Sequence, residues 1–135
     1  MKHNLKYLLY SITIITMLAA CAPDEDDDLI IDDRDKFTGT WTCNDNGSTS
    51  GTSTYTVVVE RVGELDSVRI KNFYFLGNAN AVTGKVSGNS ISLPQQTSDG
   101  ININGSGSFS NNGFSITYTA IDGSVVDNGT AVYSK

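Results

Sequence analysis

The sequence predicts an all-β fold, a small eight-stranded antiparallel up-and-down barrel over residues 37–135, and two observations carry that prediction. From Phe37 onward, apolar and polar residues alternate with the period of a half-buried strand, and no long stretch has the period of an amphipathic helix. Turn sequences separate the alternating runs at short intervals, so consecutive strands are expected to pair as a meander.

The alternation also identifies the residues that should face the barrel interior. In chain order they are Gly39, Trp41 and Cys43; Tyr55, Val57 and Val59; Val68 and Ile70; Val82, Gly84 and Val86; Ile91 and Leu93; Ile101, Ile103, Gly105, Gly107 and Phe109; and Phe114, Ile116 and Tyr118. A last strand is expected near residues 130–134, with either Ala131 and Tyr133 or Val132 inward.

Turns are expected where Asn or Asp precedes Gly, because this pair supplies the positive φ angles of tight hairpins. Such pairs are Asn46-Gly47, Asp99-Gly100, Asn112-Gly113 and Asp122-Gly123, and Gly63 and Gly88-Asn89 serve similarly. A meander leaves two exposed edges, and closure into a barrel removes both. An immunoglobulin-like sandwich would need long connections, which the sequence lacks, so the barrel is favoured.

The first twenty residues are expected to be a signal peptide rather than part of this domain. Lys2 and Lys6 give a positive start, residues 8–17 are mostly apolar, and Leu-Ala-Ala precedes Cys21. This order is that of a secretory signal, and the apolar run is too short to span a bilayer comfortably.

Cys21, directly after Leu-Ala-Ala, resembles the cysteine of the bacterial lipobox. The resemblance implies that the signal is cleaved before Cys21, that its thiol receives a diacylglycerol, and that its amino group is acylated by a fatty acid such as palmitate. Several acyl chains anchor a protein stably, whereas one chain is marginal. The alternative is an ordinary secretory signal followed by a chance cysteine.

Residues 21–36 are expected to be the lipidated cysteine and a disordered tether, because eight acidic residues between Asp24 and Asp35 repel one another. Acids soon after the cysteine resemble the surface-export signal of lipoproteins in Bacteroidota, and Ala22 replaces the aspartate of inner-membrane retention. The resemblance implies the cell outer membrane, surface-exposed, with its periplasmic face as the alternative. Without the signal, seven basic residues face fifteen acidic ones, so nucleic acid is not an expected partner.

The segment from Phe37 to Trp41 contains Gly-x-Trp and resembles the signature that opens the first strand of lipocalin-like (calycin-like) barrels. The signal, the acidic tether and the strand count extend the resemblance to small lipocalin-like lipoproteins of the Bacteroidota type. The resemblance implies that Trp41 closes one end of the barrel and that a basic residue of the last strand packs across its ring. Lys135 is the basic residue that the last strand offers.

The residues present exclude several chemistries. His3, the only histidine, lies in the signal, so a mature chain holds neither a His-activated nucleophile nor a histidine metal site, and no cofactor or metal is expected. Once Cys21 is acylated, Cys43 is the only thiol. It is either a buried apolar residue, or a reactive thiol or one that forms a disulfide with another chain.

The carboxyl groups of the domain are those of Asp45, Glu60, Glu64, Asp66, Asp99, Asp122 and Asp127. Most are expected in turns, and Glu60 on an outward face, so the chain is not expected to be an enzyme.

The segment Phe73, Tyr74, Phe75 and Leu76 is the most apolar of the domain. Either it is core that folds over the barrel mouth, or it is a lip that contacts a partner protein or a small apolar ligand. Gly105 and Gly107 either help the sheet curve or leave room for a ligand. An interior that holds so many large side chains is expected to be packed rather than hollow.

The expected function is therefore that of a lipid-anchored, non-enzymatic binding or display module. Two alternatives stay open, namely an inhibitor of a hydrolase such as a lysozyme or protease, and a carrier of a small apolar ligand.

Overall fold

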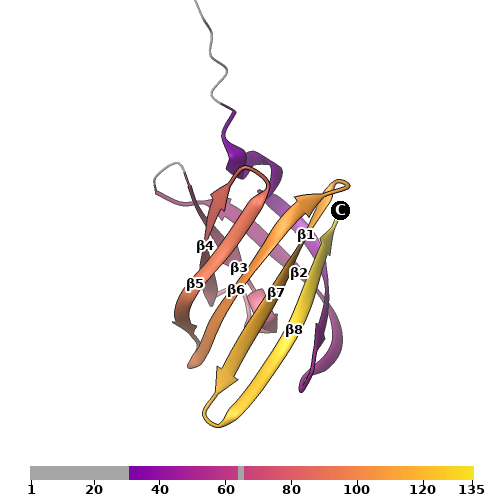
Figure 1. Cartoon of the computed structure of the whole chain (residues 1–135), viewed down its shortest axis with the longest axis vertical. Coiled ribbons are helices and arrows are strands. Elements are labelled where there is room, and N and C mark those ends of the chain that lie inside the picture. The colour runs from indigo at the N-terminus through magenta and orange to yellow at the C-terminus, as the bar shows by residue number, and fades with distance from the viewer. Residues whose placement is uncertain (1–30, 64–65) are drawn as a thin grey trace, which may run out of the picture. The chain divides into compact units, whose positions relative to one another are not determined.

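The computed structural model describes residues 31–63 and 66–135. Over these residues the chain forms a closed antiparallel barrel in which each of eight strands pairs with the next and β8 pairs with β1, as Figure 1 shows. The strands are β1 (Gly39–Gly47), β2 (Gly51–Arg61), β3 (Ser67–Lys71), β4 (Ala81–Ser87), β5 (Ser90–Ser98), β6 (Ile101–Ser110), β7 (Gly113–Asp122) and β8 (Val125–Ser134). The fold class predicted from the sequence is confirmed.

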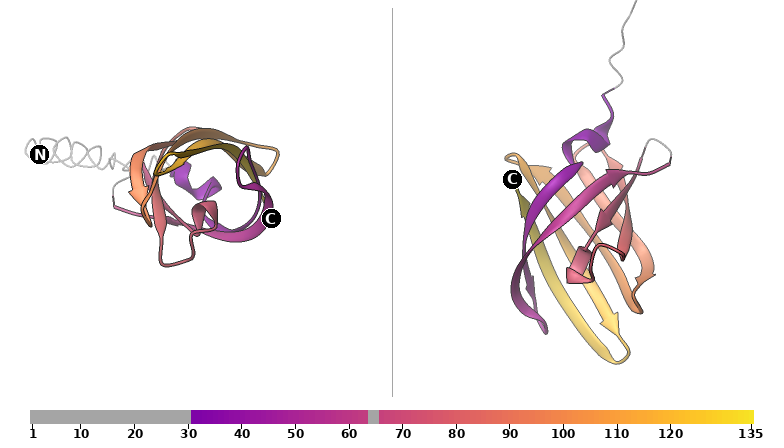
Figure 2. Two further views of the ribbon diagram at one scale, coloured as in Figure 1. Left: turned by 90° about the horizontal axis from the view of Figure 1, so that it is seen from below. Right: turned by 180° about the vertical axis from the view of Figure 1, so that it is seen from behind.

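Two short 3-10 helices, η1 (Asp33–Lys36) and η2 (Phe73–Phe75), lie at opposite ends of the barrel. Because η1 precedes β1 and the strands run up and down, the connections after β1, β3, β5 and β7 lie at the far end, which we call the η2 end. The η1 end holds η1, the β4–β5 and β6–β7 turns and Lys135. Seen along the barrel, both helices lie inside the ring of strands (Figure 2).

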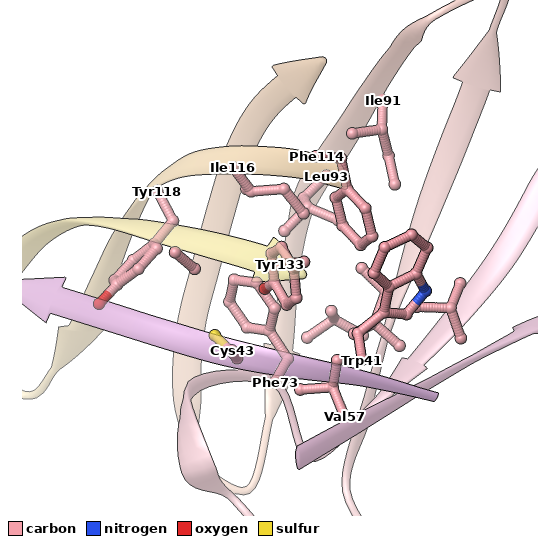
Figure 3. Close-up of a cluster of buried hydrophobic side chains, with 14 of the residues drawn as sticks. Trp41, Cys43, Val57, Phe73, Ile91, Leu93, Phe114, Ile116, Tyr118 and Tyr133 are labelled. Carbon is pink, nitrogen blue, oxygen red and sulfur yellow. The ribbon is translucent and has the colours of Figure 1, made fainter. Parts of the chain in front are cut away.

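Burial follows the alternation that the sequence predicts. In β7, Phe114, Ile116 and Tyr118 are buried, and in β2 the same holds for Tyr55, Val57 and Val59. For the last strand the structure selects the first alternative, since Ala131 and Tyr133 are buried and Val132 is exposed. The interior is filled by large side chains contributed by every strand, as Figure 3 shows for part of this core.

Gly105 and Gly107 allow β6 to approach β7 closely. A Cβ atom at position 105 would lie 2.6 Å from the carbonyl oxygen of Thr117, and one at position 107 would collide with the carbonyl oxygen of Ser115. The missing side chains therefore admit the neighbouring strand and not a ligand, which supports the first of the two interpretations of these glycines.

Two predicted strand boundaries are wrong. Asn46-Gly47 is not a turn, because β1 continues through Gly47 and the turn is formed by residues 48–50. The last strand begins at Val125, five residues before the predicted start. At both boundaries a polar residue lies within a strand, where the sequence suggested a turn. Asn46 faces outward on β1, and at the start of β8 Asp127 occupies an inward position where an apolar residue was expected.

The predicted boundary between tether and barrel also needs correction, because residues 33–36 form η1 rather than disordered chain. Arg34 is only 5% exposed. Its guanidinium pairs with Asp32 at 2.7 Å and donates to the carbonyl oxygen of Ser67 at 3.2 Å. The hydrogen bond from Arg34 lowers the pKa of Asp32 to about 2. The acids nearest the barrel thus belong to the fold, since a buried arginine needs a carboxylate partner.

An aromatic cluster closes the η1 end. The Trp41 indole nitrogen donates to the carbonyl oxygen of Phe37 at 2.8 Å. The Trp41 ring packs edge-on against Phe114 at 5.0 Å between centroids, and Phe37 packs in the same way at 5.3 Å. The ammonium group of Lys135 lies 4.3 Å from the centre of the Trp41 ring. Trp41 and Lys135, the residue that follows β8, therefore close this end of the barrel together.

Candidate binding site at the η2 end

The predicted lip, residues 73–76, is divided by the structure between core and surface. Phe73 is 1% exposed and packs against Tyr118, whereas Phe75 is 68% exposed. Tyr74 and Leu76 are partly buried against the core. The segment thus plugs the barrel mouth, as the first interpretation expects, and also presents one aromatic side chain to solvent.

The lip has an unusual backbone. Asn72, Tyr74 and Phe75 all have positive φ angles, at 62°, 56° and 60°. Residues other than glycine adopt this left-handed region at an energetic cost, so surrounding contacts must hold it in place. The side chain of Asn72 supplies two of them, donating to the carbonyl oxygen of Thr56 and accepting from the Gly77 amide, each at 2.8 Å.

Asp127 of β8 supplies a third anchor for the lip. Its carboxylate is 2% exposed and accepts a 2.7 Å hydrogen bond from the hydroxyl of Tyr74. The same carboxylate accepts from the backbone amides of Thr49 at 2.8 Å and Ser50 at 3.3 Å. One buried acid therefore joins three segments of the η2 end, namely the lip, the β1–β2 turn and the start of β8.

Asp45 forms a second buried acidic site a short way into the barrel. Its carboxyl oxygens accept from the hydroxyls of Tyr118 at 2.6 Å and Tyr55 at 2.7 Å. The ring of Tyr55 also packs against Phe75 at 5.2 Å between centroids, and that of Tyr118 packs against Tyr74 at 5.5 Å. The tyrosines thus connect the buried acids to the exposed part of the lip.

Two inward-facing glycines make room for this polar cluster. A Cβ atom at Gly47 would lie 2.5 Å from a carboxylate oxygen of Asp127, and one at Gly129 would collide with the hydroxyl of Tyr118. The η2 end is therefore built for polar groups in its interior, whereas the η1 end is filled with aromatic rings.

The cluster is ionised at Asp127. Burial alone would raise the pKa of this carboxyl group, but hydrogen bonds from Ser50, Thr49 and Tyr74 outweigh burial and lower the pKa to about 2. Burial and the hydrogen bond to Asp127 raise the pKa of Tyr74 to about 12, so its hydroxyl keeps its proton and remains a donor at neutral pH.

Cys43 and Tyr133 lie deeper in the core, directly opposite each other on β1 and β8. Cys43 is completely buried, and burial raises the pKa of its thiol to about 11. Among the described residues, the Tyr133 hydroxyl is buried without a hydrogen-bond partner. The structure thus places Cys43 where the interpretation as a buried apolar residue puts it.

Asp45 and Asp127 were expected in turns, and that expectation is wrong for both. The signal that could have found them is the period of two. Asp45 follows Trp41 and Cys43 on one face of β1, and Asp127 precedes Ala131 and Tyr133 on one face of β8. Glu60 lies in β2 and pairs with Lys71 at 2.7 Å, while Asp99 and Asp122 lie at turns as predicted.

Within residues 31–63 and 66–135, no three side chains of the types that bind metals gather at one point. An open hollow of about 500 Å³ lies at the other end of the barrel, lined by residues that include Asn111, Phe114 and Lys135. In the described part of the chain, no helix is long and apolar enough to cross a membrane.

Solved structures share this barrel. One is the structure of EF1p2_mFAP2b bound to DFHBI, with a TM-score of 0.55, 12% identity, and coverage of 75% of this chain and 94% of that chain. Another is a redesigned beta barrel, with a TM-score of 0.53, 12% identity, and coverage of 78% of this chain and 96% of that chain. At this identity the likeness shows the fold alone. No protein-family model and no curated protein matches the sequence.

Cys21 and the acidic run before Ile31 lie outside the described residues. Lipidation, the tether and the location in the outer membrane therefore stay predictions from the sequence, as does the relation to lipocalin-like proteins of Bacteroidota.

Proposed function

We propose that this chain is a lipid-anchored protein of the bacterial outer membrane that binds a partner, without catalysis, through the η2 end of its barrel. The sequence before the barrel supports the anchor, since a signal-like segment ends at Cys21 and an acidic run follows it. The barrel supports the binding role, since aromatic rings close its η1 end, whereas its η2 end presents the exposed side chain of Phe75.

The proposed anchor would join the barrel at one particular end. Ten residues separate Cys21 from Asp32, and an extended chain of that length reaches at most about 35 Å. The first described residues join the barrel at the η1 end, where Arg34 is buried. The tether would therefore join the barrel at its η1 end, which leaves the η2 end free for a partner.

The observation that carries the proposal is the lip itself. Three left-handed residues and the Tyr74 to Asp127 hydrogen bond hold Phe75 in the open, 68% exposed. A costly backbone that displays an aromatic ring is typical of a binding surface.

A small apolar ligand is the second candidate, and the comparison with a barrel bound to DFHBI favours it. In this chain Phe73 fills the mouth of the barrel and is 1% exposed. A ligand could therefore enter only if the lip moved outward, which would break the hydrogen bond between Tyr74 and Asp127.

A photo-cross-linking amino acid at position 75, in the full chain on producing cells, tests the proposal. We expect a discrete cross-linked product at position 75 and none at Val132, an exposed residue on the outer face of β8. Equal labelling at both positions, or none at 75, would rule out the lip as the binding surface. Native mass spectrometry of the same protein separates the candidates, because a carried ligand adds a small constant mass.

Two further measurements test the anchor. Mass spectrometry should find diacylglycerol and an acylated amino group on Cys21 as the first residue. Added protease should digest the barrel on intact cells if it is displayed, whereas a periplasmic protein would be digested only after the outer membrane is opened. An intact Met1 or an unmodified Cys21 would contradict the proposal.

A further inference from the structure

Charge is distributed unevenly between the two ends of the barrel. The connections at the η2 end cover residues 48–50, 72–80, 99–100 and 123–124, and the charged residues in them or directly beside them are Asp99 and Asp122, the last residue of β7. Just inside this end lie Asp45 and Asp127, each less than 4% exposed. Neither buried acid makes an ion pair with a lysine or arginine of the described chain, since tyrosine hydroxyls, the Ser48 hydroxyl and backbone amides satisfy both.

Most basic residues of the described barrel lie toward the η1 end or are paired with an acid, and Arg69 lies exposed in the middle of β3. Arg34, Lys36 and Lys135 lie at the η1 end. Lys71 precedes the lip, but its ammonium group is 2.7 Å from Glu60. The described connections of the η2 end therefore carry acidic residues and no basic ones, and such a charge distribution attracts cations.

Exposed apolar side chains occupy the same end. Phe75 is 68% exposed, and Val125 and Val126, at the start of β8, are 51% and 47% exposed. The hydrogen bond between Tyr74 and Asp127 joins the two segments that carry them. Val125 and Val126 point to opposite faces of β8, so an extended partner that covers Phe75 would reach them at the end of the barrel and not as one flat surface.

From this juxtaposition we infer that the η2 end docks a cationic, amphipathic peptide segment of a partner protein, whose apolar side chains cover Phe75 and whose lysines or arginines face Asp99 and Asp122. The inference rests on the proposed binding role of the lip and adds the chemistry of the partner. These acids disfavour an anionic partner. A polypeptide suits the surface better than a small ion, because the exposed residues belong to separate segments.

Three fluorescein-labelled synthetic peptides test the inference. One alternates lysine and leucine, one replaces each lysine by glutamate, and one replaces each leucine by serine. Binding is measured by fluorescence anisotropy to the full chain in phosphatidylcholine vesicles, with protein-free vesicles as the blank. We expect the lysine and leucine peptide to bind at least about tenfold more tightly than the other two.

Variants of the protein locate the binding. Phe75→Ser should weaken it about tenfold, the loss expected when a central aromatic contact is removed. Asp99→Asn together with Asp122→Asn should weaken it about fivefold, as two exposed ion pairs would. Asp66→Asn, which removes a charge at the η1 end, is the matched control and should change the affinity less than about twofold.

The acidic tether is the competing explanation, because it would attract any cationic peptide. A variant in which five acids of the tether are replaced by their amides distinguishes binding by the tether from binding by the η2 end. The five are Asp24, Glu25, Asp26, Asp27 and Asp28. Binding that disappears in this variant but survives Phe75→Ser and the double variant overturns the inference.

The remaining outcomes are also decisive. Equal binding of the lysine and glutamate peptides, lost in Phe75→Ser, overturns the cationic partner but keeps the lip as a binding surface. Absence of binding by all three peptides overturns the inference, while cross-linking at position 75 still decides the proposed function. A dimer in sedimentation that Phe75→Ser converts to monomer would show that a second copy covers the patch, and would likewise overturn it.

Discussion

The ammonium group of Lys135 lies 4.3 Å from the centre of the Trp41 ring, so the first and last strands of the barrel meet at the η1 end through a cation–π contact. Lys135 also donates to the carbonyl oxygen of Thr38 at 3.4 Å. β1 and β8 pair through residues 42–47 and 129–134. The side chains of Trp41 and Lys135 thus cover the η1 end of the β1–β8 pairing that closes the barrel.

The two members of this pair should differ greatly in their effect on stability. Trp41→Ala removes a side chain that is 2% exposed and should lower the free energy of unfolding by about 3–5 kcal/mol. Lys135→Met should lower it by only about 0.5–1 kcal/mol, the usual size of an exposed cation–π contact. Urea unfolding followed by circular dichroism measures both, with Val132→Ser as a neutral control. A tryptophan variant as stable as the parent would refute this account of the η1 end.

Asp127 should make the barrel sensitive to acid. Its folded pKa of about 2 lies below the ordinary value of 3.8, so its contribution to stability is complete above about pH 4 and is lost as the pH falls toward 2. At pH 7, Asp127→Asn should lower the free energy of unfolding by about 1–3 kcal/mol, because hydrogen bonds to a charged group are weakened. Its pH profile should also be flatter between pH 4 and 2.

Urea midpoints between pH 2 and pH 7 measure this difference. Part of the acid sensitivity should remain in the variant, since Arg34 lowers the pKa of Asp32 to about 2 as well. Asp122→Asn, an exposed turn residue, should leave the profile of the parent unchanged. Parallel profiles for the parent and Asp127→Asn would contradict the assignment.

The thiol of Cys43 should be unreactive in the folded barrel. It is fully buried and burial raises its pKa to about 11, so maleimide should label it at pH 8 only after unfolding. In urea, a lipidated chain should show one thiol and an unlipidated chain two, because Cys21 and Cys43 are the only cysteines. Fast labelling of the native protein, lost in Cys43→Ala, would show that the core opens.

Gly107 should not tolerate a side chain. A Cβ atom there would collide with the carbonyl oxygen of Ser115 on β7, so Gly107→Ala should lower the free energy of unfolding by roughly 1–3 kcal/mol. Ser106→Ala changes the adjacent, outward-facing position and should alter stability by less than about 0.5 kcal/mol. Thermal unfolding of the two variants gives the comparison, and equal melting temperatures would exclude the close approach of the strands.

The barrel could be predicted from the sequence because its signal repeats in every strand. Val57 and Val59, or Ile116 and Tyr118, alternate with polar residues along one strand, and the expected faces are the buried ones. The turns at Asp99-Gly100 and Asp122-Gly123 could be predicted for the same reason, since they depend on local backbone preferences.

The polar cluster could not be predicted in the same way, because its members look like solvent-exposed residues. Asp45 precedes Asn46-Gly47 and Asp127 lies beside Asn128, so local composition favours turns at both places. Their burial depends on tyrosines from other strands, and Tyr118 reaches Asp45 across 73 positions of sequence. The left-handed lip escaped prediction for a related reason, because Asn72 and Asp127 hold it only in the folded barrel.

The contact between Thr38 and Lys135 also bears on how the chain can be reordered. Residues at the two limits of the barrel are neighbours in space, so a short glycine linker could join them without crossing the fold. New ends opened at the exposed Gly123 would then leave every strand pairing in place. A circular permutant of this kind would move a fused reporter from one mouth of the barrel to the other.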